Sequence, residues 1–520
     1  ANASVGQQAL QNNTTGSYNT ALGSSALNGN TTAGYNTAVG QSALSTNTTG
    51  QYQTAIGQGA LSTSNADNNS AFGVSALGAC TTGVHNTAMG RNGASGLTTG
   101  TNNIAIGNYT MNGTVTGGSN IAVGYAALNA LTTGSNNTAV GRDALVALTT
   151  GGGNTAIGYK SCDAMTTGNN NVALGANSLG SNTTGEMNCA IGINALDANT
   201  TAHYNTAIGT HALGANTTAA NNTAVGYYAL FSNTVGTENV AVGNEALDTN
   251  VTGSTNTACG FRALEANTDS GNSAFGAYAL FTNSTGTDNC ALGKSALGAN
   301  TTGDDNVAVG REALRQNTTG QENVAVGHEA LEQNTTAIRN TAVGASALAT
   351  NTTGANNTAM GYLALTGNTT ASYNTAMGDN AMVVNTTGAG NAAFGAYALY
   401  ANTTGHSNTA LGSYSPSTGG SNVVAAMRHN TTGTYNVAVG TGALATNSTG
   451  SYNTAVGYTA LFSGTGGENT AVGYEALKDN STGVENTAVG SNALANNTTA
   501  HYNTAVGRQA MLGNTTGAYN

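Results

Sequence analysis

The chain has 520 residues, a formal net charge of −11 and only 6% charged residues. Its 11 Lys and Arg residues form no patch, which disfavours nucleic-acid binding, and no run approaches the roughly 18 apolar residues needed to span a membrane. Trp is absent, Pro occurs once and Gly occurs 74 times, a composition that would ordinarily indicate disorder. Regularly spaced apolar positions argue against disorder.

A glycine that follows a hydrophobic residue returns at a regular interval, 30 times in all from Gly6 to Gly507. The full unit, N-T-A-V-G-x-x-A-L-x-x-N-T-T-G-x-x, is seen from Asn36 to Tyr52. A short period that persists along a whole chain indicates one structural unit that stacks on itself. Because no linker interrupts the pattern, residues 1–520 are predicted to be a single continuous repeat array.

Each repeat is too short and too rich in Gly, Asn and Thr to hold helices. The T-A-V and A-L segments suit two short β-segments joined by two turns. We therefore predict an all-β fold, a parallel β-solenoid with 17 residues per coil and about 30 coils. At a strand spacing of about 4.8 Å the stack would be a rod roughly 150 Å long. The predicted structural positions are those of Gly23, Asn36, Val39, Gly40 and Leu44.

Differences in length between repeats indicate which part of the repeat is the turn and which is the strand. Three units are shorter than the others by a single residue, for example the unit that ends at Gly73, and each loses it between the Leu and the next Asn. Loops tolerate such losses, so the N-T-T-G segment is predicted to be the outer turn. Near 413–429 the glycine spacing is 28 and the only proline, Pro416, occurs. We predict an irregular, clipped coil there, with a functional loop as the alternative, and a return to register at Ala426 and Met427.

Residues one repeat apart would lie above one another, so each repeat position would form a column. The Asn positions are predicted to form amide ladders, and Tyr18, Tyr35 and Tyr52 to stack. Neighbouring residues of a strand point to opposite faces, so either the bulky residues face inward and the alanines outward, or the reverse. Exposed Val and Leu columns would be buried by self-association, and we therefore predict a homo-oligomer.

No pattern of catalytic residues occurs in the sequence. The cysteines have no paired spacing and are predicted to be small buried residues; they are Cys80, Cys162, Cys189, Cys259 and Cys290. The histidines are scattered, and no nucleophile elbow, phosphate-binding loop or dinucleotide-binding motif occurs in a suitable context. We predict that the protein is not an enzyme and has no cofactor, apart from the calcium alternative that follows.

Charged residues gather once, between Asp288 and Arg339. Three acidic residues share one column in successive coils: Asp288, Asp305 and Glu322. Opposite charges interleave, with Arg315 one repeat before Glu332, so we predict a solvated, charge-balanced patch. The alternative is a low-affinity Ca²⁺ site at the three carboxylates, because carboxylate oxygens suit this hard cation.

Several repeats match the N-x-T acceptor sequence for N-glycosylation, and the candidate positions are Asn13, Asn30, Asn47, Asn317 and Asn334. The alternative is an Asn/Thr ladder that happens to match the motif. Glycans on successive coils would be crowded at a repeat of about 4.8 Å, so full occupancy would need an outward-fanning arrangement.

The segment from Asn36 to Leu44, N-T-A-V-G-x-x-A-L, resembles the head repeats of trimeric autotransporter adhesins. The longer pattern N-T-A-x-G-x-x-A-L…N-T-T-G is still more similar to repeat arrays of bacteriophage-type tail-fibre proteins, and this resemblance covers essentially the whole chain. It implies a left-handed parallel β-roll, trimeric and exported or virion-borne, that serves reach and attachment. The adhesin repeat is shorter, so the resemblance does not fix the packing of the N-T-T-G segment. The chaperone domain of tail fibres and the stalk and anchor of adhesins do not occur in these residues.

We therefore expect a structural fibre or filament that gives reach and surface attachment, located extracellularly, on a cell surface or on a virion. Its partners would be further copies of itself, in a trimer or end to end, and a cell-surface receptor or glycan. One alternative is a glycosylated extracellular filament without its own receptor. The other is an ice-binding solenoid, but the position of most Thr residues in N-T-T turns, away from a flat strand face, argues against it. The chain begins at Ala1 and ends inside a repeat at Asn520, so we expect it to be part of a longer protein.

Overall fold

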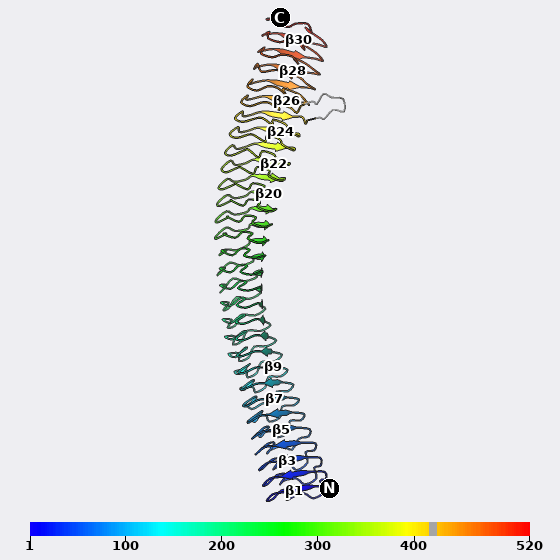
Figure 1. The fold of residues 1–520 in the computed structure, drawn as a ribbon, viewed down its shortest axis with the longest axis vertical. Helices are drawn as coiled ribbons and strands as arrows, with labels where there is room; N and C mark the ends of the chain where they lie inside the picture. Colours follow the sequence, from blue (N-terminus) through cyan, green and yellow to red (C-terminus); the bar gives the residue numbers. More distant parts are fainter. Residues whose placement is uncertain (415–423) are drawn as a thin grey trace. The chain divides into compact units, whose positions relative to one another are not determined.

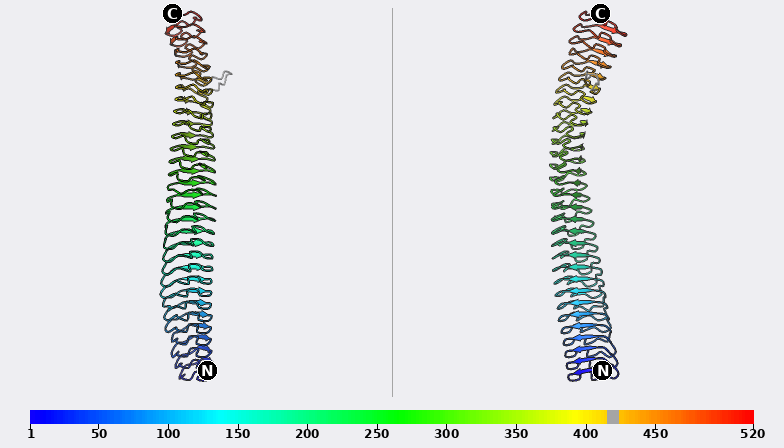
Figure 2. Two further views of the ribbon diagram at one scale, coloured as in Figure 1. Left: turned by 90° about the vertical axis from the view of Figure 1, so that its left-hand side faces the viewer. Right: turned by 45° about the vertical axis from the view of Figure 1, so that its right-hand side comes forward.

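Each repeat forms one coil of a parallel β-solenoid in the computed structural model, which describes residues 1–414 and 424–520. These residues form two compact units, Ala1–Asn256 and Thr257–Asn520, and each unit is built from the same coil. Within a unit, each coil contributes one three-residue strand that pairs in parallel with the strand of the next coil (Figure 1 and Figure 2). The described residues contain no helix, and the predicted all-β parallel solenoid with one repeat per coil is confirmed.

The strands of the first unit are β1 (Ala3–Val5), β2 (Thr20–Leu22), β3 (Thr37–Val39), β4 (Thr54–Ile56), β5 (Ser70–Phe72), β6 (Thr87–Met89), β7 (Ile104–Ile106), β8 (Ile121–Val123), β9 (Thr138–Val140), β10 (Thr155–Ile157), β11 (Val172–Leu174), β12 (Cys189–Ile191), β13 (Thr206–Ile208), β14 (Thr223–Val225) and β15 (Val240–Val242). The strands of the second unit are β16 (Thr257–Cys259), β17 (Ser273–Phe275), β18 (Cys290–Leu292), β19 (Val307–Val309), β20 (Val324–Val326), β21 (Thr341–Val343), β22 (Thr358–Met360), β23 (Thr375–Met377), β24 (Ala392–Phe394), β25 (Thr409–Leu411), β26 (Val437–Val439), β27 (Thr454–Val456), β28 (Thr470–Val472), β29 (Thr487–Val489) and β30 (Thr504–Val506).

Successive strands stack without a shift, so every residue lies beside its equivalent in the next repeat. Thr206 of β13 lies beside Thr223 of β14, and the pattern continues along both strands. A coil from one of the shortened repeats keeps the same register, because Ala55 of β4 still lies beside Ala71 of β5. The missing residue is therefore absorbed outside the strand.

The second predicted β-segment, A-L, is not a strand. In the repeat that starts at Asn36, Ser42 and Leu44 have φ of 56° and 51°, in the left-handed region that turns the chain. An extended segment would send Ala43 and Leu44 to opposite faces, whereas this turn buries both completely. The left-handed conformation disfavours residues with a side chain by roughly 1–2 kcal/mol, a cost that burial of the Leu side chain offsets.

The core consists of one inward face of the strand and the A-L turn. Ala38, Ala43 and Leu44 are completely buried, whereas Val39 points outward and is half-buried. Neither predicted arrangement is therefore correct, because the bulky column of the strand faces out while the Leu column faces in.

The glycine that follows each strand is required for both conformation and space. Gly40 has φ of 133°, which residues with a side chain rarely adopt. A Cβ atom at Gly40 would lie 2.6 Å from the carbonyl carbon of Gly57 in the next coil. This double constraint explains why this glycine marks the repeat.

Two ladders of Asn side chains link the coils, as predicted. The inner asparagine column, formed by the Asn before each strand, bonds to the backbone: the Gln53 N–H donates to Asn36 Oδ1 (2.9 Å), and Asn36 Nδ2 donates to the Gly50 carbonyl (2.9 Å). The turn asparagine column is formed by the Asn of N-T-T. There Asn47 Nδ2 donates to the Gly50 carbonyl (2.9 Å) and to Asn30 Oδ1 (3.4 Å). These bonds satisfy polar groups that would otherwise be buried without a partner.

The irregular coil predicted near 413–429 falls partly outside the described residues, and so does Pro416. The coils on either side of 415–423 are in register, because Ala410 of β25 lies beside Ala438 of β26. Ala426 and Met427 are completely buried in the positions of Ala and Leu. The predicted return to register at these residues is confirmed.

Candidate functional site

The three acidic residues proposed for calcium, here called the carboxylate column (Asp288, Asp305 and Glu322), are exposed on the surface of successive coils. Arg339 Nε lies 2.8 Å from Glu322 Oε2, and this hydrogen bond together with the charge of Arg339 lowers the pKa of Glu322. In residues 1–414 and 424–520, no group of three or more His, Cys, Asp or Glu side chains is placed to hold a metal ion. Glu322 is thus engaged with the guanidinium of Arg339.

Several other charges of this region form ion pairs, as expected for the predicted charge-balanced patch. Arg315 Nη2 lies 2.6 Å from Glu332 Oε1. Arg311 lies 3.3 Å from Glu312 and 3.6 Å from Glu329. Such exposed pairs each contribute about 0–1 kcal/mol, so they hold side chains in place more than they stabilise the fold.

The asparagines proposed for glycosylation belong to the turn asparagine column. Asn30, Asn47, Asn317 and Asn334 are completely buried, and Asn13 is half-buried. The nitrogen that would carry a glycan is already used, since the Nδ2 of each donates to the carbonyl three residues further on. In the folded coil these amide nitrogens therefore belong to the Asn ladder.

The predicted tyrosine stack is present on the surface of the first unit. The ring centroids of Tyr18 and Tyr35 lie 4.9 Å apart, and those of Tyr35 and Tyr52 lie 5.2 Å apart. The equivalent pair in the second unit, Tyr435 and Tyr452, is also stacked at 5.2 Å. The stacking follows directly from the register of the coils.

The prediction that all five cysteines are buried is wrong for three of them. Cys80 and Cys162 are buried, but Cys189 and Cys290 are half-buried and Cys259 is exposed. The latter three occupy the first or third position of a strand, and both positions face outward. Cys80 replaces the Asn of the turn column, and its burial raises the pKa of its thiol to about 11.

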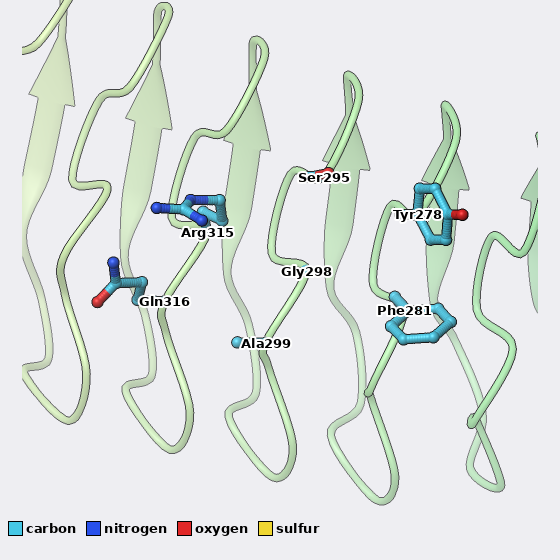
Figure 3. Close-up of a pocket in the computed structure, with 7 residues that line it drawn as sticks. All are labelled: Tyr278, Phe281, Ser295, Gly298, Ala299, Arg315 and Gln316. Atoms are coloured by element: carbon cyan, nitrogen blue, oxygen red, sulfur yellow. The ribbon is translucent and has the colours of Figure 1, made fainter.

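A depression that was not predicted lies on the surface of the second unit (Figure 3), with a volume of about 300 Å³. Seven residues line it: Tyr278, Phe281, Ser295, Gly298, Ala299, Arg315 and Gln316. The repeat position after the buried Leu holds Phe281, Gly298 and Arg315 in three successive coils. Because Gly298 has no side chain, a gap remains between an aromatic ring and a guanidinium group. We call this depression the Gly298 notch.

The two sides of the Gly298 notch differ in chemistry. Tyr278 and Phe281 lie on one side with their rings edge to face and centroids 5.4 Å apart, and Arg315 and Gln316 lie on the other (Figure 3). Arg315 donates from Nε and Nη2 to Glu332 Oε1, at 3.1 and 2.6 Å. These bonds use two of the five N–H donors of the guanidinium, so the group is fixed in place and still has donors to offer.

The first unit carries a related depression, the Gly214 notch, with a volume of about 260 Å³. Here Asp197, Gly214 and Phe231 occupy the same repeat position in successive coils, so a glycine again separates a charged residue from an aromatic ring. Asn194 and His211 also line it, and the rings of His211 and Phe231 lie 5.9 Å apart. Burial, together with the charge of Asp163, raises the pKa of Asp197.

The notches were missed because glycine is so frequent in this chain that one more at a variable position carries no obvious signal. The informative signal is the pair of residues one repeat before and one repeat after it. Gly78 occupies the same repeat position, but its column neighbours, Ser62 and Ser95, supply neither a ring nor a charge. A glycine flanked in its column by an aromatic and a charged residue would have identified both notches.

The part of the chain that the structure describes contains no helix with the length and apolar composition that spanning a membrane requires. No protein-family model matches the chain, and no curated protein sequence matches it. The fold places the protein in the class of parallel β-solenoid repeat proteins.

Proposed function

We propose that the protein is a structural extracellular fibre or filament that gives reach and surface attachment. The observation that supports this most directly is the in-register stacking of coils within each unit. Because a coil packs only on its neighbours, additional coils lengthen a unit without enlarging its core. At about 4.8 Å per coil, the strands β1 to β15 would extend the first unit over roughly 70 Å.

The proposal includes self-association through the outer sheet face, defined as the first and third residues of each strand. None of these positions in β1 to β30 carries a charge, and the third position exposes bulky apolar side chains. Ile56 is 39% exposed, and Met89 and Leu174 are each 45% exposed. Continuous apolar stripes of this kind usually mark an interface. We propose a trimer of left-handed coils, following the resemblance to trimeric autotransporter adhesins.

Sedimentation velocity and small-angle scattering test this proposal together. We expect the wild-type chain to be an elongated oligomer. The double variant Ile208→Lys/Val225→Lys, with two charges on the outer sheet face, should dissociate into elongated monomers. Thr49→Lys, on the exposed N-T-T turn, is the matched control and should leave the oligomer intact. A compact wild-type particle would contradict the fibre, and an unaffected oligomer in the double variant would contradict the interface.

An extracellular, cell-surface or virion location follows from the proposed role, with a surface receptor or glycan as the partner. Immunogold labelling of intact cells and virions from the source tests the location. We propose neither an enzymatic activity nor a bound cofactor. The alternative of a glycosylated filament receives no support from the buried amides of the turn asparagine column.

One observation favours a second candidate, an ice-binding solenoid. The strand Thr residues face outward beside the bulky column, as do Thr206 and Thr223 next to Ile208 and Val225, so threonines are not confined to the N-T-T turns. A regular array of hydroxyl and methyl groups is suited to ordering water. A clear thermal hysteresis of the purified protein would favour this candidate over the fibre, and its absence would remove it.

A further inference from the structure

We infer that the Gly298 notch binds one neutral pyranose ring of a glycan. The inference rests on the proposed role in surface attachment and names the chemistry of the surface that would be recognised. Three features of the notch support it: aromatic rings, polar side chains, and an arginine whose charge is balanced by a carboxylate. They surround the space left by the absent side chain of Gly298.

The size of the notch matches a single sugar ring. Its volume of about 300 Å³ lies at the lower end of small-molecule sites. Gly298 and Ala299 form the part between the two walls, and neither projects a large side chain into the gap (Figure 3). A monosaccharide unit, alone or within a longer glycan, fits this space.

The two walls match the two kinds of surface on a pyranose. The C–H groups of a sugar ring form an apolar patch that packs against aromatic rings, and Tyr278 and Phe281 supply such rings. The sugar hydroxyls need donors and acceptors at the edge of the ring. Arg315, Gln316 and Ser295 supply them from the two following coils.

The charge of the notch favours a neutral sugar over an acidic one. The Arg315 guanidinium lies 2.6 Å from Glu332 Oε1, so its positive charge is already compensated by a carboxylate. A sugar carboxylate would have to compete with Glu332 for the same group, whereas a hydroxyl accepts from the remaining N–H donors. We therefore assign glucose-, galactose- or mannose-type rings to this notch rather than uronic or sialic acids.

The Gly214 notch supports this reading from the first unit. It repeats the arrangement at the same repeat position, with Asp197, Asn194 and His211 as the polar groups and Phe231 as the ring. The charged residue and the aromatic exchange places along the column. A ring, a gap and polar side chains thus occur together at both notches.

Saturation-transfer NMR of the whole chain with methyl pyranosides tests the inference. Methyl glucoside, galactoside and mannoside are compared with methyl glucuronide, in a Phe231→Ala background that removes the aromatic ring of the other notch. We expect a Kd of about 1 mM or weaker for at least one neutral pyranoside, as is usual for so small a ligand. Gly298→Val should weaken that binding at least tenfold, and Phe281→Ala should weaken it similarly.

The matched control is Gly78→Val, at the same repeat position but between two serines, and it should change the Kd less than twofold. Valine occurs naturally at this position at Val146 and Val383, so the coil accommodates it. Binding that survives Gly298→Val, tighter binding of the glucuronide, or no transfer to any neutral pyranoside would overturn the inference. Scattering of the same samples separates the two proposals: an elongated particle without sugar binding refutes only the notch, and a compact particle refutes the fibre.

Discussion

Replacing Asn222 by Ala should locally destabilise the first unit by breaking one rung of the inner asparagine column. Asn222 is completely buried, and its Nδ2 donates to the Gly236 carbonyl at 2.9 Å. Its Oδ1 accepts from the backbone N–H of Asn239, also at 2.9 Å. The substitution therefore removes one donor and leaves a buried backbone N–H without its acceptor.

The expected loss of stability follows from these two bonds. A lost hydrogen bond costs about 1 kcal/mol, and a buried donor left unsatisfied costs about 1–3 kcal/mol. The Gly236 carbonyl keeps a second donor, because Asn233 Nδ2 also lies 2.9 Å from it. The sum is about 2–4 kcal/mol, or roughly a 30- to 700-fold increase in local opening.

Asn216→Ala, in the turn asparagine column of the same unit, is the matched control. Asn216 is equally buried, and its Nδ2 donates to Asn199 Oδ1 at 3.2 Å and to the Ala219 carbonyl at 3.0 Å. Its Oδ1 accepts only from a side chain, Asn233 Nδ2 at 3.1 Å, among the hydrogen bonds described. No backbone N–H loses its partner, so we expect about 1–2 kcal/mol.

Native-state hydrogen exchange measured by mass spectrometry is the appropriate assay, because the stability of a solenoid is a local property of neighbouring coils. Peptides covering β14 and β15 should lose protection in Asn222→Ala by about tenfold more than in Asn216→Ala, because the middles of the two expected ranges differ by roughly 1.5 kcal/mol. Equal loss of protection in the two variants would refute the reasoning that the backbone acceptor distinguishes the two columns.

Four further outcomes are expected. Gly209→Ala should destabilise its unit by about 3 kcal/mol, measured by hydrogen exchange. The reason is that Gly209 has φ of 136° and that a Cβ atom there would lie 2.6 Å from the carbonyl carbon of Gly226. Unchanged exchange in the variant would contradict this. A maleimide at pH 8 should label the exposed Cys259 at once and Cys80 only on unfolding, because burial raises the pKa of Cys80 to about 11; equal rates would be the opposing result. Arg339 lowers the pKa of Glu322 below its ordinary value of 4.5, so the pair stabilises the fold at higher pH and this contribution is lost as the pH falls through the lowered pKa. Carboxyl NMR titration should show the pKa of Glu322 rising in Arg339→Gln. Calorimetry should detect at most weak Ca²⁺ binding at the carboxylate column, and a submicromolar site would contradict the structure-based reading.

The repeat made the stacking predictable, because any contact between equivalent residues follows from the period alone. The amide ladder through Asn36 and the stack of Tyr18 on Tyr35 are of this kind, and both are present. Position within the coil was harder to predict. The polar side chain of Ser42 and the apolar side chain of Leu44 give no sign of left-handed φ, so the sequence predicts a strand where the chain turns.

The candidate site was predictable only where like residues recur. The pairing of Arg315 with Glu332 follows from their separation by one repeat. The Gly298 notch depends instead on a missing side chain between two unlike neighbours, and a consensus pattern averages such differences away. Burial of Asn47 was also hidden, because its sequence motif is the same whether the amide points inward or outward.

The constancy of register from coil to coil has an evolutionary consequence. Insertion of the codons for one repeat adds a coil whose two faces match the coils already on either side. Unequal recombination between neighbouring repeats of the gene can therefore lengthen or shorten the protein in whole steps, without any compensating mutation. Length becomes a trait that varies independently of the chemistry displayed on any single coil.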